Sequence, residues 1–307
     1  MDINNTKRRE VLQMAIASLF SATTPVHALQ PRSTDAPAAK ALADLERSVG
    51  GRLGVAMLNT ASGQITGHRL TERFAMCSTV KLPLAGVILR EIDQGRLRRD
   101  QWVPYGPTDM VQNSPVTSQH LERGGMTVAA LAEATQTTSD NTAANVLLKL
   151  LGGPPGFTAM LRAAGDPTTR LDRLEPQLNL VTGKDLRDTT TPAAMARTTA
   201  HMLTSDWLTT TSRETLAQWM VATTTGTKRL RAGLPPSWRA GDKTGTATAP
   251  QMRDKYNDVA IAWPPGKPPF VISAFLETRY SHPKIRDEDQ AVLAEVGRIA
   301  TRWSLSL

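Results

Sequence analysis

Segments with the pattern of β-strands lie at both ends of this 307-residue chain, and the segments between them have the pattern of helices. Five segments are predicted to be strands from their apolar and β-branched residues and from the turns that bound them: residues 53–58, 65–69, 238–244, 259–263 and 270–277. A sheet that takes strands from both ends must close across the helical middle of the chain. We therefore predict an α/β fold with a helical lobe inserted between two portions of one sheet.

The helical segments are bounded by recognisable start and stop residues, such as Thr127 before one helix and Gly152-Gly153 after another. Helices are predicted at residues 38–49, 78–91, 128–135, 142–150, 157–164, 192–204, 212–222 and 287–303. Residues 170–188 show no usable periodicity and resemble an Ω-loop. Loops of that length are usually functional or disordered.

The segment Ser78-Thr79-Val80-Lys81 precedes an apolar run from Leu82 to Leu89. A segment that is apolar on all sides is typical of a buried helix, and this one is too short to span a bilayer. Positions three apart share a helix face, so Ser78 and Lys81 are predicted to lie side by side at the helix start. Unpaired N–H groups and the helix dipole favour developing negative charge there. The pattern suits a hydroxyl nucleophile beside an amine, although a surface serine and a solvated lysine would have the same sequence.

The composition is that of a globular protein, with 40% hydrophobic and 21% charged residues. The net charge of +8 favours anionic ligands, but aromatic residues make up only 5% and no basic run is interleaved with them, so nucleic acid is not an expected partner. The five histidines are scattered without zinc-site spacing, and neither a metal nor another cofactor is expected. Cys77 is the single cysteine, which rules out an intramolecular disulfide.

The N-terminus has the pattern of a signal peptide over residues 1–28. Lys7, Arg8 and Arg9 form a positive region, residues 11–20 are mostly apolar, and Val26-His27-Ala28 fits a cleavage site. The paired arginines resemble a twin-arginine signal, and a Sec signal is the alternative. We expect cleavage near Ala28, export to the periplasm and no membrane attachment afterwards.

Further polar clusters follow along the chain, and each has an ordinary structural interpretation when taken alone. Ser139-Asp140-Asn141 lies between two predicted helices and could be a plain N-cap. Lys243-Thr244-Gly245-Thr246 is on a predicted strand, where lysine and threonine suit a solvated edge. Glu175-Pro176-Gln177-Leu178-Asn179 lies in the irregular loop, where its carboxylate could form a salt bridge. Thr224-Thr225-Gly226 with Arg229 and Arg231 could be a turn with surface charge.

Together with Ser78 and Lys81, these clusters make the chain resemble a class A serine β-lactamase. S-x-x-K, S-D-N and K-T-G are motifs of these enzymes and of penicillin-binding proteins, and all three occur here in the family's order and at family-like intervals. The resemblance covers nearly the whole mature chain. It includes the segments 114–117, 170–176, 187–192 and 231–235.

The resemblance implies a fold of two lobes. A mostly antiparallel five-stranded sheet flanked by helices, an α/β/α sandwich, would be formed by residues 29–69 and 221–307. An all-helical lobe would be formed by residues 70–220 and would include the Ω-loop 170–188. It also implies a monomeric β-lactam hydrolase of antibiotic resistance, whose partners are small-molecule penicillins and cephalosporins.

The same resemblance implies the catalytic roles. Ser78 attacks the lactam carbonyl and forms an acyl-enzyme. Its base is Lys81, or Glu175 acting through a water. Ser139 relays a proton to the departing nitrogen, and Glu175 with Asn179 holds the water that hydrolyses the ester. The N–H groups of Ser78 and Thr246 form the oxyanion hole.

Further residues are implied to bind substrate or to support the site. Asn141 and Lys243 hold the proton-transfer network with Lys81. The Lys243-Thr244-Gly245-Thr246 strand faces the substrate carboxylate together with Ser139. Some relatives add an arginine where this chain has Tyr256, so Arg229 is expected to supply that charge. Arg231 is expected to be structural, and Arg173 is expected to pair with Asp188 across the Ω-loop.

Three departures bear on the substrate. Asn113 occupies a place that often holds an aromatic residue, so stacking there is not expected. Ala247 stands where carbapenem-hydrolysing relatives have a cysteine that pairs with the one matching Cys77. Thr246 and the long segment 248–258 favour cephalosporins.

Two other functions are compatible with the first three motifs. A D-alanyl-D-alanine peptidase would share them, but the cluster from Glu175 to Asn179 argues against it. A non-catalytic β-lactam sensor domain would be acylated and stay acylated, and it would usually be tethered to a transmembrane helix.

Overall fold

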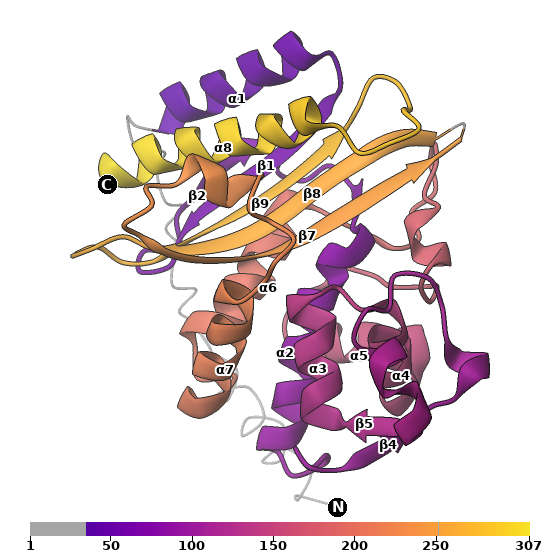
Figure 1. Ribbon diagram of the computed structural model, residues 1–307. Coiled ribbons are helices and arrows are strands. Elements are labelled where there is room, and N and C mark those ends of the chain that lie inside the picture. Colours follow the sequence, from indigo (N-terminus) through magenta and orange to yellow (C-terminus); the bar gives the residue numbers. More distant parts are fainter. Residues whose placement is uncertain (1–34, 251) are drawn as a thin grey trace, which may run out of the picture. The chain divides into compact units, whose positions relative to one another are not determined.

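A five-stranded antiparallel sheet separates two layers of helices (Figure 1). The computed structural model describes residues 35–250 and 252–307, which belong to one compact unit. The expected signal peptide 1–28 lies outside the described residues. The strand order is β2-β1-β9-β8-β7. The strands are β1 (Arg52–Asn59), β2 (Ile65–His68), β7 (Arg239–Ala249), β8 (Met252–Trp263) and β9 (Phe270–Glu277).

The sheet joins the two ends of the chain. β1 pairs along its whole length with β9, from Arg52 opposite Glu277 to Asn59 opposite Phe270. Residues 53–58 and 270–276 are buried, because helices cover both faces of these central strands. The predicted sheet with strands from both ends is confirmed.

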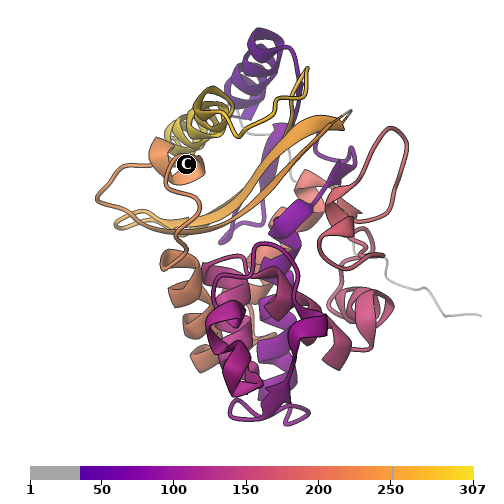
Figure 2. The same ribbon diagram turned by 45° about the vertical axis from the view of Figure 1, so that its right-hand side comes forward.

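Two helices cover one face of the sheet, and Figure 2 shows the same arrangement from a second direction. They are α1 (Asp35–Val49) and α8 (Asp287–Leu305). Leu42 of α1 and Val296 of α8 are buried in a cluster with Ile272 of β9. The amphipathic pattern of α8 therefore packs its apolar side onto the sheet.

The other layer is organised around α2 (Lys81–Asp93), whose residues 81–89 are all buried. It packs against every other helix of that layer (Figure 1). These are α3 (Val128–Thr137), α4 (Asn141–Leu150), α5 (Gly153–Ala163), α6 (Pro192–Thr204) and α7 (Thr210–Val221). An apolar run with no polar side is stable here because it is surrounded by other helices.

Four short strands lie among these helices, so residues 70–220 also contain two small ladders. They are β3 (Phe74–Ala75) with β6 (Thr189–Thr190), and β4 (Trp102–Pro104) with β5 (Gly125–Thr127). The first ladder joins the end of the Ω-loop to the residues just before Ser78. No helix in the described part of the chain is long and apolar enough to cross a membrane.

Several predicted boundaries were wrong. β8 begins at Met252 rather than at residue 259, so residues 248–258 form most of a hairpin and not a long loop. Several of the polar residues that hid this strand are buried and hydrogen-bonded, as Asn257 shows below. α5 begins at Gly153 rather than at residue 157, because prolines fit the first turn of a helix. Ser78 lies in a 3₁₀ turn, Cys77–Val80, that precedes α2.

Candidate active site

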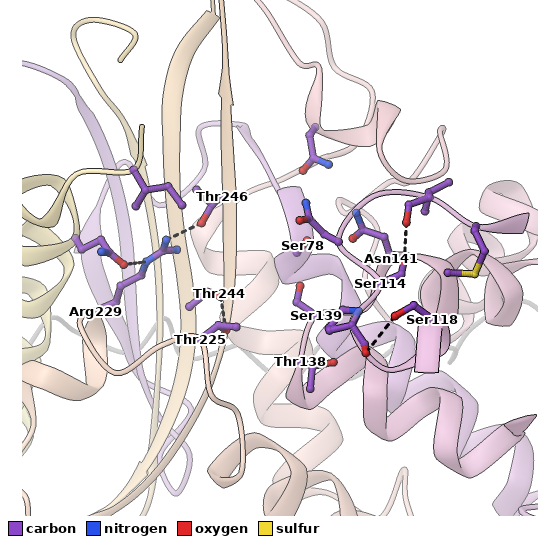
Figure 3. Close-up of a pocket in the computed structure, with 17 residues that line it drawn as sticks. Ser78, Ser114, Ser118, Thr138, Ser139, Asn141, Thr225, Arg229, Thr244 and Thr246 are labelled. Atoms are coloured by element: carbon purple, nitrogen blue, oxygen red, sulfur yellow. Dashed lines mark hydrogen bonds between the residues drawn. The ribbon is translucent and has the colours of Figure 1, made fainter. Parts of the chain in front are cut away.

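The turn Cys77–Val80 presents Ser78 between the sheet and the helical layer (Figure 3). Cys77 has a φ of 48°, a left-handed conformation that is uncommon for residues other than glycine. Its side chain is buried against Ala75, Val181, Ala247 and Met252, and burial raises the pKa of the thiol to about 12. Cys77 is thus a packing residue behind the turn, while Ser78 is partly exposed.

Lys81 lies one turn after Ser78, as predicted. Its Nζ donates to Ser78 Oγ at 3.1 Å and to the Ser139 carbonyl oxygen at 2.8 Å. It also donates to Asn141 Oδ1 and lies 3.0 Å from Glu175 Oε1. The side chain is fully buried. A buried ammonium is stable only when it is paired and hydrogen-bonded, and this one is both.

The Ω-loop brings Glu175 to the other side of Ser78. Ser78 Oγ donates to Glu175 Oε1 at 3.1 Å, and Asn179 Nδ2 donates to Oε2 at 2.6 Å. The backbone of Glu175 is fixed by Asn145, whose side chain bonds both its N–H and its carbonyl at 2.9 Å. Asn145 and Asn179, both far from Ser78 in sequence, thus hold the Glu175 carboxylate next to the Ser78 hydroxyl.

The Ser139-Asp140-Asn141 cluster is both an N-cap and part of the site. Asp140 caps α4 through Ala143 N and also binds Thr117 N at 2.9 Å. Ser139 has a φ of 61°, so the turn is again left-handed, and its hydroxyl accepts from Lys243 Nζ at 3.0 Å. Asp140 is therefore the N-cap that the sequence suggested as an alternative, whereas Ser139 and Asn141 line the cavity.

β7, the edge strand of the sheet, forms the wall opposite Ser139 (Figure 3). Gly245 packs directly on the Ser78 turn: a Cβ there would lie 2.7 Å from the Met76 carbonyl oxygen and 3.0 Å from Thr79 N. Asn257 on β8 donates to the carbonyls of Ala75 and Met76 at 2.8 and 3.0 Å. The absence of a side chain at residue 245 sets the width of the site.

Gly245→Ala is therefore expected to separate β7 from the Ser78 turn, lowering kcat/KM for a β-lactam about tenfold or more and lowering the Tm. A displacement of this kind costs about 1–3 kcal/mol in a well-packed core. Gly106→Ala is the matched control, because nothing lies within 4 Å of a Cβ at Gly106 and its φ is −135°. Equal effects in the two variants would contradict the role of the close contact.

Arg229 reaches the site from the segment after α7. Its Nη2 donates to Thr246 Oγ1 at 2.6 Å, and its Nη1 donates to the carbonyls of Gly245 and Asn257. Gln290 of α8 accepts from Nε at 3.3 Å. Tyr256 is fully buried and its hydroxyl accepts from Arg286 N, so it lies outside the cavity lining, whereas Arg229 belongs to that lining. Arg231 pairs with buried Asp242, in the structural role expected of it.

These elements enclose a cavity of about 800 Å³. Of the residues predicted to form the site, Ser78, Ser139, Asn141, Asn179, Arg229, Thr244 and Thr246 line it. Lys81, Glu175 and Lys243 are buried just beneath, each hydrogen-bonded to a residue of the lining. Asn113 and Ala247 are where the sequence suggested: Asn113 lines the cavity, and Ala247 packs beside Cys77.

Several further residues belong to the site or support it and were not predicted, among them Asn145, Asn257, Ile285 and Gln290. Asn145 follows Asn141 by four positions, so the helical period could have placed both on one face. Asn257, Ile285 and Gln290 carry no comparable signal, because only tertiary packing brings them to Ser78 or Arg229.

Lys243 carries the most perturbed charge in this site. Complete burial, and next the nearby Lys81 charge, lower the pKa of Lys243 to about 7. The folded state therefore holds fewer protons on this lysine than the unfolded chain does between about pH 7 and pH 10.5. Its positive charge is present below pH 7 and is lost as the pH rises.

We expect kcat/KM for a carboxylate-bearing β-lactam to fall as the pH rises above about 7, approaching tenfold per pH unit at the limit, since a neutral Lys243 attracts the carboxylate less. The profile is measured at substrate concentrations well below KM. Lys243→Arg keeps its charge throughout this range and should move the fall to higher pH. Coincident profiles of the two proteins would show that another group titrates.

Comparison with known proteins shows the family of this chain. The model of the Beta-lactamase enzyme family matches residues 37–303. β-Lactamase AST-1 of Nocardia asteroides is 44% identical over 95% of this chain and 94% of its own. β-Lactamase L2 of Stenotrophomonas maltophilia is 44% identical over 94% of this chain and 93% of its own. An ancestral class A β-lactamase of Gram-negative bacteria superposes with a TM-score of 0.81 and 51% identity, covering 86% of this chain and 99% of that structure.

The fold and the family model define the chain as a β-lactam hydrolase. Within that class, the chain belongs to the class A serine β-lactamases, as the resemblance of its motifs implied.

Proposed function

We propose that the protein hydrolyses β-lactams in two steps, through an acyl-enzyme on Ser78. One observation carries the proposal: Ser78 Oγ opens onto the 800 Å³ cavity and lies 3.1 Å from both Lys81 Nζ and Glu175 Oε1. A hydroxyl that acts as a nucleophile must give its proton to a base within hydrogen-bond reach, and both candidate bases meet that requirement.

In the first step, Ser78 Oγ bonds to the lactam carbonyl carbon and the C–N bond of the ring breaks. The N–H groups of Ser78 and Thr246 stabilise the oxyanion; each such donor contributes about 3–4 kcal/mol in related sites. Ser139 passes a proton to the departing nitrogen. It is well placed for this, because its Oγ lies 3.4 Å from Lys81 Nζ and 3.0 Å from Lys243 Nζ.

In the second step, Glu175 activates a water that attacks the ester. Acylation removes the proton by which Ser78 Oγ donates to Glu175 Oε1. That oxygen then becomes free to accept from a water, while Asn179 holds Oε2 in place. The water oxygen bonds to the ester carbon, and Ser78 leaves with a proton, which regenerates the enzyme. General-base assistance of this kind contributes about 10²–10⁴-fold.

The carboxylate that penicillins and cephalosporins carry would lie against Lys243, Thr244, Thr246 and Ser139. Arg229 adds its charge behind Thr246 and is positioned by Gln290. Thr225 fixes Thr244 by a 2.6 Å hydrogen bond between their hydroxyls. We further propose export to the periplasm after cleavage near Ala28, and action there as a monomer.

Hydrolysis is tested by adding a chromogenic cephalosporin to the purified protein at a hundredfold molar excess. All of the substrate should be consumed, because each acyl-enzyme is released. A penicillin and a carbapenem assayed in parallel give the substrate profile. One burst per molecule, with stoichiometric labelling of Ser78, would instead identify a sensor or a peptidase.

A further inference from the structure

A second cavity of about 550 Å³ lies against the Ω-loop and shares no lining residue with the active-site cavity. Residues 181–186 of the loop form one wall. The opposite wall comes from the sheet and from the short ladder of β3 and β6. Its residues are Arg52 of β1, Met252, Arg253 and Lys255 of β8, Glu277 of β9, and Arg73, Ala75 and Thr189. Its volume is within the range of about 300–1,000 Å³ that is typical of small-molecule sites.

Positive charge predominates in this cavity. Its lining contains five basic residues and two acidic ones: Arg52, Arg73, Lys184, Arg253 and Lys255, with Asp185 and Glu277. Both acids are already paired, Glu277 with Arg52 at 3.0 Å and Asp185 with Arg187 at 2.9 Å. Arg73 donates to Thr189 Oγ1 and to the Thr168 carbonyl, both of which are neutral. The cavity therefore has positive charge that its own carboxylates do not balance.

Lys255 is the only buried side chain among these five cations, and it has few partners. It is 3% exposed, and its Nζ makes one long hydrogen bond, 3.3 Å, to the Arg253 carbonyl oxygen. Within residues 35–250 and 252–307, no carboxylate lies within 4.0 Å of it. An ammonium has three protons to donate, and a buried charge without a partner is costly. Burial lowers the pKa of Lys255, in agreement with that cost.

We propose that this cavity binds a phosphate-class oxyanion, with Lys255, Arg253 and Arg73 as its principal ligands. Arginine and lysine are the side chains that recognise phosphate oxygens, and the anion would give Lys255 the partner that the chain does not provide. Lys184 also lines the cavity and lies in the Ω-loop, whereas Lys255 lies on β8, so an anion that contacts both would link the loop to the sheet. Because the same loop carries Glu175 and Asn179, the anion would also steady the residues beside Ser78.

Thermal unfolding of the full protein tests the proposal, with sodium pyrophosphate as the probe at constant ionic strength. The Tm should rise by about 3–6 °C at ten times the Kd. Lys255→Met and Arg253→Gln should each abolish most of that rise; Arg253 is exposed, so its variant is expected to fold even if Lys255→Met does not. Lys267→Met is the matched control, because Lys267 also donates only to backbone carbonyls and lies outside the cavity.

Lys243→Met separates the two cavities, because pyrophosphate could also bind beside Ser78. The rise should persist in this variant. Hydrogen exchange should slow at residues 181–186 when pyrophosphate is added. A rise in Tm that survives in both Lys255→Met and Arg253→Gln, or that disappears only in Lys243→Met, would overturn the proposal.

Orthophosphate in the same series tests the size of the ligand. A rise in Tm with either anion supports the site, and no rise with both anions refutes it.

Discussion

Glu175→Gln is expected to stop the enzyme at the covalent stage. Ser78 should still be acylated, but kcat should fall by about 10²–10⁴-fold, because glutamine cannot take a proton from the attacking water. Mass spectrometry of the intact variant after brief exposure to a penicillin should show the mass of one added substrate molecule. Peptide mapping should place it on Ser78.

Glu133→Gln is the control for this experiment, since Glu133 is an exposed carboxylate on α3 and its loss should change nothing. Two results would contradict the expectation in different ways. Normal turnover in Glu175→Gln would remove Glu175 from the mechanism. A variant that is neither labelled nor active would make Glu175 the base of the first step and leave Lys81 as an electrostatic partner.

Arg173→Ala is expected to destabilise the Ω-loop and lower the free energy of unfolding by about 3 kcal/mol. Arg173 Nε pairs with Asp188 Oδ2 at 2.5 Å, and the Asp188 side chain is fully buried. The variant would leave that charge with only the N–H groups of Asp172 and Arg173 as donors. Denaturant unfolding measures the loss, and a turnover panel measures any change in substrate preference.

Arg170→Ala provides the comparison, because Arg170 pairs with Asp172 in the same loop while its side chain is 42% exposed. Exposed pairs contribute about 1 kcal/mol or less, so this variant should unfold nearly as the wild type does. Equal losses in the two variants would mean that the loop depends on its arginines in general and not on the buried pair.

The parts of the fold that could be predicted from sequence are those with local signals. Thr191 caps α6 and Pro192 occupies its first position, and the helix 192–204 was predicted with its observed bounds. β9 is nearly all apolar and was also predicted with its observed bounds. β8 was predicted to start seven residues late, because Asp254, Lys255, Asn257 and Asp258 hide it. Three of these polar residues, Asp254, Asn257 and Asp258, are buried with partners that only the folded chain supplies, such as Leu230 N for Asp258.

The candidate site also has residues that could be predicted from local sequence and residues that could not. Short motifs led to Ser78, Lys81, Ser139 and Lys243, and in the structure these four residues form one chain of hydrogen bonds, in that order. A motif does not show what fixes its own backbone. Asn145 behind Glu175, and Asn257 behind the Ser78 turn, act through backbone groups, so nothing in the motifs pointed to them.

The pairing of β1 with β9 has a consequence for the order in which a newly made chain can become active. Arg52 pairs with Glu277, so the centre of the sheet cannot form until residues near the end of the chain have been synthesised. Contacts between such distant residues are slow to form, because the chain must first lose the entropy of closing a very long loop. Lys243 and Thr246 lie on β7, which is also in the last part of the chain to be synthesised and belongs to the same sheet. A nascent chain that already contains Ser78 and Lys81 therefore does not yet have a complete active site. Catalytic activity requires that the two ends of the chain have paired in the sheet.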